Sequence, residues 1–89
     1  MKVQAEKLNS ENAMAFKREL LAAVADGDLT LDMSAVRQAD SSVVSVLLAG
    51  RRAAQERGAE LEVVSAPAKL IELAKLYGTL ELLGLKPRS

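Results

Sequence analysis

The segment from Leu29 to Leu83, LTLDMSAVRQADSSVVSVLLAGRRAAQERGAELEVVSAPAKLIELAKLYGTLELL, decides the fold of this 89-residue chain. It begins with LTLDM (29–33), in which apolar and polar residues alternate as they do along a half-buried strand. Asp40-Ser41-Ser42 consists of residues that cap helix N-termini, and an apolar run starts directly after it at Val43. The sequence therefore predicts a strand, a polar loop and a helix in that order.

The predicted helix that starts at this loop ends at Arg57 and Gly58, because a cation in the last turn and a glycine after it are both favoured there. The residues expected to face inward from this helix are Val44, Leu47, Leu48 and Ala54. A strand is predicted over Leu61–Val64, and a helix with Pro67 at its first position follows. The buried face of this helix is expected to consist of Leu70, Ile71, Leu73, Ala74 and Tyr77. Gly78 should end it, and Thr79 should cap a last short turn that contains Leu80 and Leu83.

The N-terminal part predicts one more strand and one more helix. Lys2–Leu8 alternates and is interpreted as a strand, and Asn9 or Ser10 then offers a helix cap with Glu11 in the first turn. Apolar residues follow at spacings of three and four, as on one face of a helix, and Gly27 ends the pattern. These apolar residues are Ala13, Phe16, Leu20 and Ala23.

Strands and helices thus alternate along residues 1–89, which are expected to form a single α/β domain with mostly parallel strands in a small mixed sheet. Three short strands are few for a stable sheet, so the N-terminal region is expected to contribute more than its sequence pattern reveals.

Composition excludes several classes of function. Twelve basic residues balance twelve acidic ones, so the chain lacks the basic excess of a nucleic-acid binder or of a polybasic membrane anchor. Cys and His are both absent, which excludes disulfides, zinc sites and nucleophilic catalysis based on either residue. The N-terminus lacks the apolar stretch of a signal peptide, and no apolar run is long enough to cross a bilayer. We therefore expect a cytoplasmic protein with no catalytic residues, no metal and no cofactor.

Isolated residues that could carry chemistry have simpler interpretations. Asp32 stands at a strand end, where carboxylates often bind ligands, but nothing nearby in sequence completes a site, and a solvated or hydrogen-bonded structural role is favoured. The glycines do not form the glycine-rich loop that holds a phosphate. Asp40-Ser41-Ser42 contains two hydroxyls, which is more than one cap needs. At a helix N-terminus they suit either a phosphoserine or a polar contact with a partner.

The stretch from Leu29 to Leu83, with LNSENAMAFKRELL (8–21) before it, resembles a STAS domain: a strand ending in L-D-L-S-x-V, a D-S/T-x loop, a long helix, a strand and a Pro-led helix. Two branches of that family compete. Anti-sigma-factor antagonists carry D-S-S-G-L/I-G, whereas this chain has DSSVVS (40–45) and lacks both glycines. MlaB proteins carry a third helix close to P-x-x-L-x-x-L-A-x-L-Y-G, which PAKLIELAKLYG (67–78) matches nearly throughout.

The MlaB resemblance is the closer one. It implies a non-catalytic accessory subunit that binds and stabilises or regulates the ATPase of an Mla-type phospholipid ABC transporter, held at the inner membrane through that partner. Asp40, Ser41 and Ser42 would form the partner-binding loop. The alternative resemblance implies a phosphorylation-controlled switch that binds an anti-sigma-factor kinase, with Ser42 as phosphoacceptor. A homodimer stays open. STAS domains usually have two strands before the first helix, so the first family strand is expected to be short or missing here.

Overall fold

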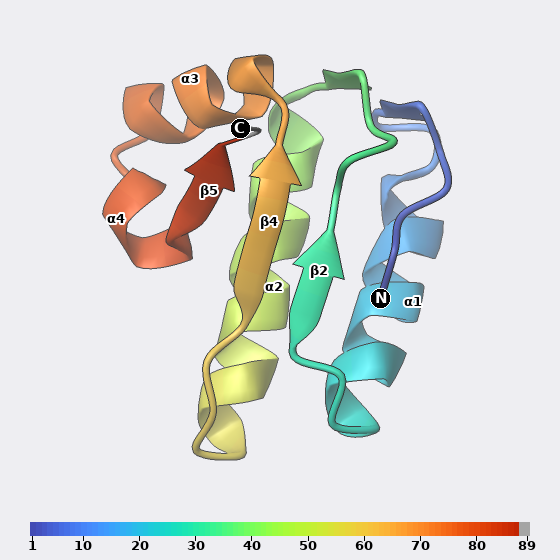
Figure 1. Ribbon diagram of the computed structural model, residues 1–89, viewed down its shortest axis with the longest axis vertical. Coiled ribbons are helices and arrows are strands. Elements are labelled where there is room, and N and C mark those ends of the chain that lie inside the picture. Colours follow the sequence, from blue (N-terminus) through green and yellow to red (C-terminus); the bar gives the residue numbers. More distant parts are fainter. Residues whose placement is uncertain (88–89) are drawn as a thin grey trace.

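The computed structural model describes residues 1–87. The elements follow one another as β1 (Lys7–Leu8), α1 (Ala13–Ala25), β2 (Thr30–Asp32), β3 (Gln38–Ala39), α2 (Ser41–Glu56), β4 (Glu62–Ala66), α3 (Ala68–Leu76), α4 (Leu80–Leu83) and β5 (Leu85–Pro87). In Figure 1, α1 and α2 lie side by side behind the sheet, while α3 and α4 lie beside β5. The predicted α/β fold is confirmed.

The strands form one three-stranded sheet in the order β2-β4-β5 and a separate pair, β1-β3. Every strand pairing within residues 1–87 is parallel, as expected for strands joined by helices, and the antiparallel pair that a mixed sheet would include does not occur there. Residues 1–3 extend the larger sheet: Asp32 donates its N–H to Met1, and Val3 donates to Asp32 at 2.9 Å.

The N-terminal segment therefore pairs twice, first with the edge of β2 and then with β3. The single strand expected over Lys2–Leu8 is corrected to an isolated bridge at Lys2 and the two-residue strand β1. Between the bridge at Lys2 and the strand β1, the chain leaves the edge of β2 and crosses to β3. The alternation of residue types does not reveal this crossing. Two further strands, β3 and β5, were not predicted.

The core lies between the sheet and the two long helices. The side chains that are almost completely buried are Leu20, Val24, Leu31, Met33, Val36, Val43, Leu47, Val63 and Leu70. Phe16 is the only aromatic side chain among the buried residues, so leucine, valine and alanine fill this core. Gly50 is buried where α2 passes α1, and a Cβ placed on it would lie 2.6 Å from Leu20 Cδ2. The two helices approach closely because this position carries no side chain.

Arg57 ties α2 to α1. Its guanidinium Nη1 donates to the carbonyls of Val24 and Ala25, the second at 2.8 Å, which lie in the last turn of α1. The Val24 carbonyl also accepts the N–H of Gly27 at 3.0 Å, and a cation is favoured beside the last carbonyls of a helix. Gly27 and Gly58 follow the two helices with positive φ, so both predicted helix ends are confirmed.

Three local predictions are corrected. α1 begins at Ala13 rather than after Ser10, because Asn9 to Asn12 form a turn in which the Asn12 side chain accepts the N–H of Asn9. Pro67 precedes α3 instead of opening it, since its ψ of 148° is extended. Tyr77, expected in the core, is 54% exposed because α3 ends at Leu76 and the chain turns away.

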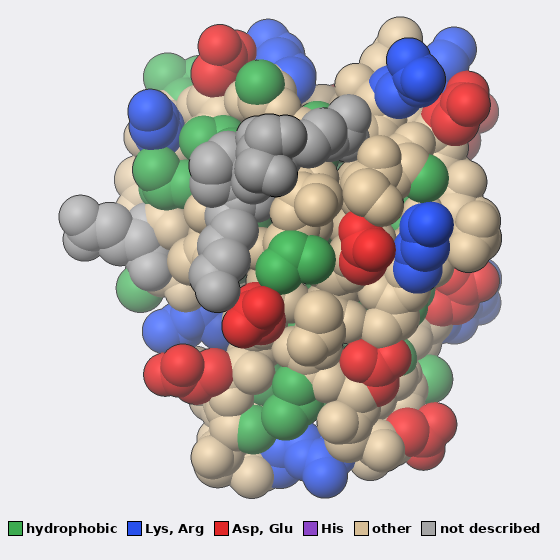
Figure 2. All heavy atoms as spheres, in the orientation of Figure 1, with side chains coloured by type: hydrophobic (Ala, Val, Ile, Leu, Met, Phe, Trp, Pro, Cys, Tyr) green, Lys and Arg blue, Asp and Glu red, His purple; other side chains and the backbone are tan. Residues whose placement is uncertain are grey.

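The face of the sheet opposite α1 and α2 carries polar side chains among apolar ones. Thr30, Asp32 and Glu62 alternate along β2 and β4 with the buried Leu31 and Val63. Figure 2 views this face and shows acidic, basic and hydrophobic side chains interspersed over it. Among residues 1–87, no helix combines the length and apolar composition needed to cross a bilayer.

Candidate functional site

Asp40 is the N-cap of α2. Its backbone is extended, with φ −105° and ψ −175°, and its carboxylate Oδ1 accepts the N–H of Ser42 at 2.9 Å. The Ser42 hydroxyl donates to the same oxygen. The predicted capping function of this loop is therefore performed by Asp40, and the Ser42 hydroxyl is bound to it.

The cap also fixes the loop to the N-terminal segment. Asp40 Oδ2 accepts the N–H of Ser10 at 3.3 Å, and the Asp40 N–H donates to the carbonyl of Leu8 at 3.1 Å. These contacts join residues thirty positions apart in sequence. The start of α2 is consequently held in place before any partner binds.

Hydrogen bonds to the ionised Asp40 lower its pKa below its ordinary value of 3.8. The largest cause is the hydroxyl of Ser42, and the backbone N–H groups of Ser42 and Ser10 add to it. Because the folded-state pKa lies below the unfolded one, the stabilisation is present above pH 3.8 and is lost as the pH falls through the folded pKa.

Asp40→Ala is expected to lower the midpoint of urea unfolding at pH 7, because the variant loses all three accepted hydrogen bonds. Asp40→Asn keeps a capping acceptor and should unfold at a higher urea concentration than Asp40→Ala. The difference in stability between wild type and Asp40→Asn should shrink as the pH is lowered from 5 to 3. A difference that stays constant over this range would show that the carboxylate charge is not stabilising.

Ser41 is the first residue of α2 and is exposed, and its hydroxyl makes no hydrogen bond to the backbone and side chains that the structure describes. It borders a shallow depression of about 270 Å³. The other residues around this depression are Val44, Ser45, Leu48, Tyr77 and Thr79. Ser41 at the start of α2 and Tyr77 at the end of α3, which are 36 residues apart in sequence, thus border one place on the surface.

Large hydrophobic side chains are exposed at the end of α3 and on α4. Tyr77, which borders this depression, is 54% exposed, its neighbour Leu76 is 77% exposed, and Leu82 on α4 is 52% exposed. We call these three residues the α3–α4 ridge. Among the described residues only Met14, on α1, is a comparably exposed large hydrophobic side chain. Clustered exposed apolar side chains of this kind are typical of protein-binding surfaces.

The sequence placed Leu76 and Tyr77 on a helix but did not identify them as surface residues. Thr79 helps to set their position, because its hydroxyl donates to the carbonyl of Ala74 at 3.2 Å and closes the end of α3. It therefore serves α3 and not, as predicted, the cap of the following turn, where its side chain makes no capping bond.

The other candidates have structural roles. Asp32 Oδ1 accepts the N–H of Ser34 at 2.8 Å, and this bond is the main reason that the pKa of Asp32 is lowered. The hydrogen-bonded interpretation of Asp32 is confirmed. Within the part of the chain that the structure describes, no three acidic side chains come together as a metal site would require.

One comparison with known proteins identifies the family, and a second shows a protein of similar fold. The family model described as "Mlab, STAS domain" matches residues 5–84. A putative anti-sigma factor antagonist from Thermotoga maritima, solved by crystallography, has a similar fold with a TM-score of 0.76. The two proteins are 21% identical, and the similarity covers 96% of this chain and 76% of that one. No curated protein matches the chain. Because the family model extends over nearly all of the described residues, the chain belongs to the MlaB-type STAS domain family.

Proposed function

We propose that this domain is a non-catalytic accessory subunit of an Mla-type phospholipid ABC transporter, and that it binds the transporter's ATPase and stabilises or regulates it. The binding surface would consist of Ser41 and its depression together with the α3–α4 ridge. Its location would be the cytoplasmic side of the inner membrane, where the ATPase holds it.

The observation that carries this proposal is the meeting of Ser41 with the exposed end of α3. The loop and the PAKLIELAKLYG helix are the two parts of the sequence that resemble MlaB, and both contribute to the same depression. Leu76 and Tyr77 offer apolar area beside a polar hydroxyl, which is the composition of a binding hot spot surrounded by polar contacts. An exposed hydroxyl next to apolar side chains suits the binding of another protein, and we therefore propose binding and not catalysis.

Ser41→Asp tests the proposal because it separates folding from binding. An exposed aspartate in the first turn of α2 is compatible with the helix dipole, so the free energy of unfolding should change by less than about 0.5 kcal/mol. In an interface the new carboxylate would be desolvated without a partner. We expect affinity for the cognate ATPase to fall at least tenfold, about 1.4 kcal/mol, in a titration calorimetry experiment.

Ala15→Asp is the matched control, because Ala15 is also exposed in the first turn of its helix, α1, and does not border the depression. Its affinity for the ATPase should equal that of the wild type. Unchanged binding by folded Ser41→Asp would mean that the loop serves only to start α2.

A second candidate function is that of an anti-sigma-factor antagonist whose loop is phosphorylated by a kinase. The similarity to the Thermotoga protein favours it, as does the exposed hydroxyl at the start of α2. Ser42 is the predicted phosphoacceptor, yet its hydroxyl is bound to Asp40, whereas that of Ser41 is accessible. Mass spectrometry of the protein from cells distinguishes the functions: an accessory subunit should carry little phosphate, and stoichiometric phosphate on either serine would favour the switch.

A further inference from the structure

A second surface lies at the other end of α3. A cavity of about 650 Å³ opens where β4 ends, between the loop that joins β2 to β3 and the first two turns of α3. Crevices at the carboxyl ends of parallel strands are where α/β sheets commonly bind ligands. The cavity shares no residue with the depression beside Ser41. We call it the basic groove.

The groove has an apolar floor and a charged rim. Val36, Ala66 and Pro67 are buried and Ile71 is half-buried, and these residues supply the apolar lining. The rim carries Arg37, Lys69 and Lys75 and a single acid, Glu72. The chain as a whole is neutral, so this excess of two positive charges is local.

These cations are available to a ligand. Among the side chains that the structure describes, none of the three has a carboxylate within ion-pair distance, and this includes Glu72 on the neighbouring turns of α3. In contrast, the guanidinium group of Arg51 donates to the side chain of Gln55, and that of Arg57 donates to the carbonyl of Val24. The rim charges are exposed to solvent and would gain from a negatively charged partner.

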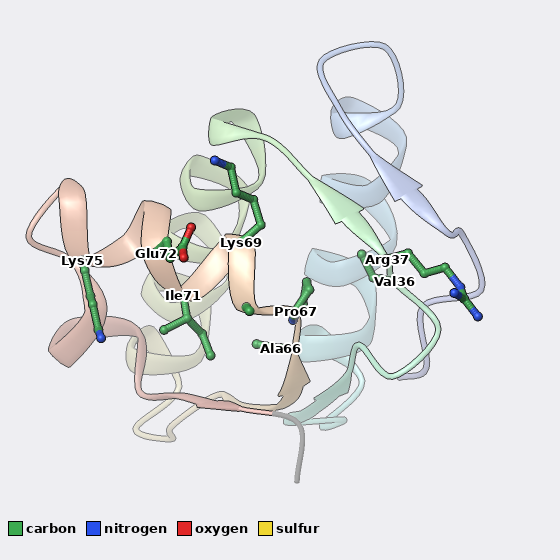
Figure 3. A pocket seen from close by; sticks show the side chains of 9 residues that line it. Val36, Arg37, Ala66, Pro67, Lys69, Ile71, Glu72 and Lys75 are labelled. Atoms are coloured by element: carbon green, nitrogen blue, oxygen red, sulfur yellow. The ribbon is translucent and has the colours of Figure 1, made fainter.

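The arrangement of the cations suits an extended ligand. Figure 3 shows Lys69 and Lys75 leaving α3 in different directions, with Arg37 on the far side of Pro67. Six residues of helix separate the two lysines by about 9 Å along the axis. The three charges do not converge on one point, as the recognition of a single phosphate would require.

The backbone of the groove is already fixed. The N–H of Arg37 donates to the carbonyl of Glu6 at 2.7 Å, and that of Met33 donates to Val64 at 3.0 Å. Ser65 lies directly before the groove and has a left-handed φ of 57°, at the irregularity in the pairing of β4 with β5. The ring of Pro67 fixes the backbone φ angle two residues later. A segment that binds here meets a formed surface, so little ordering free energy opposes its binding.

We propose that the basic groove binds an extended acidic segment of a partner protein, with an apolar side chain of that segment against Ile71, which is half-buried and borders the groove. The segment would run along α3, so that its carboxylates reach Lys69 and Lys75 in succession. This site does not depend on which protein binds the Ser41 surface. It would allow the domain to hold two segments at once, one at each end of α3.

The test uses the full-length ¹⁵N-labelled protein and a blocked decapeptide made of Asp and Glu with two central leucines. The peptide should shift the amide resonances of residues 36–37 and 66–71. Lys69→Glu/Lys75→Glu should weaken its binding at least tenfold, and Arg18→Glu/Arg52→Glu, which reverses two exposed charges on α1 and α2, should leave binding unchanged. All four side chains are exposed, and the amide spectrum of each variant verifies its fold.

Several outcomes would overturn the proposal. They are the absence of binding, shifts confined to other residues, equal weakening in both double variants, and equal binding of the same peptide with Asn and Gln in place of Asp and Glu. In the remaining part of the experiment, sodium phosphate is titrated into the labelled protein to test for binding of a small anion. If phosphate shifts residues 66–71 and displaces the peptide at a lower concentration than sodium chloride does, the groove is a small-anion site instead.

Discussion

Gly50→Leu is expected to lower the free energy of unfolding by about 3 kcal/mol, because it overpacks the contact between α1 and α2. A single added carbon at this position would already lie 2.6 Å from Leu20 Cδ2 and 3.2 Å from Leu61 Cδ2. Leu20 is almost completely buried, so its side chain cannot move aside into solvent. The gain in helix propensity on replacing glycine, about 0.8 kcal/mol, offsets only part of the strain.

Arg52→Leu is the matched control, because it places the same side chain on the exposed face of α2. Its free energy of unfolding, measured by urea denaturation, should stay within about 0.5 kcal/mol of the wild type. A domain of this length has a total stability of roughly 4–13 kcal/mol, so the loss in Gly50→Leu is easily measured. Gly50→Leu with unchanged stability would mean that α1 and α2 do not pack this closely.

The double variant Leu76→Glu/Tyr77→Ser is expected to weaken binding to the ATPase by roughly thirtyfold or more, corresponding to the loss of one strong hot spot of about 2 kcal/mol. Both side chains are mostly exposed, so their removal takes little from the core. Folding and binding should therefore respond differently: the melting temperature should stay close to wild type while the dissociation constant rises.

Met14→Glu provides the comparison for this variant. Met14 is 64% exposed, as hydrophobic as the ridge residues, and lies on α1, which packs against α2. Its replacement should leave ATPase affinity unchanged in surface plasmon resonance with immobilised ATPase. Equal losses from Met14→Glu and from the double variant would show that the ridge is not the specific contact surface.

The parts of the fold that local chemistry determines were predictable. A capping run followed by an apolar stripe placed the start of α2 within Asp40-Ser41-Ser42, and the structure shows that Asp40 is the cap, through the bond from the Ser42 N–H. The strands β2 and β4 were predicted to within two residues, because each has its own pattern of alternation or a short apolar run. Asp32 was correctly taken for a structural carboxylate.

The parts that depend on tertiary pairing were not predictable. β3 has only two residues and exists because Lys7–Leu8 lies beside it, and β5 is a strand because β4 offers it a parallel edge. Neither carries a periodic signal of its own. Tyr77 continued an apolar stripe that the end of α3 interrupts, so a residue assigned to the core lies on the surface beside Ser41. The candidate loop was therefore found from the sequence, but its apolar neighbours were not.

The most direct test of the proposed function is to measure which partner the domain binds. The purified domain is mixed in turn with the ATPase of a cognate Mla-type transporter and with a cognate anti-sigma-factor kinase, and each mixture is analysed by size-exclusion chromatography with light scattering. An accessory subunit should co-elute with the ATPase, Ser41→Asp should abolish that complex, and the kinase should elute alone. Co-elution with the kinase, together with an ATPase that elutes without the domain, would contradict the proposed function.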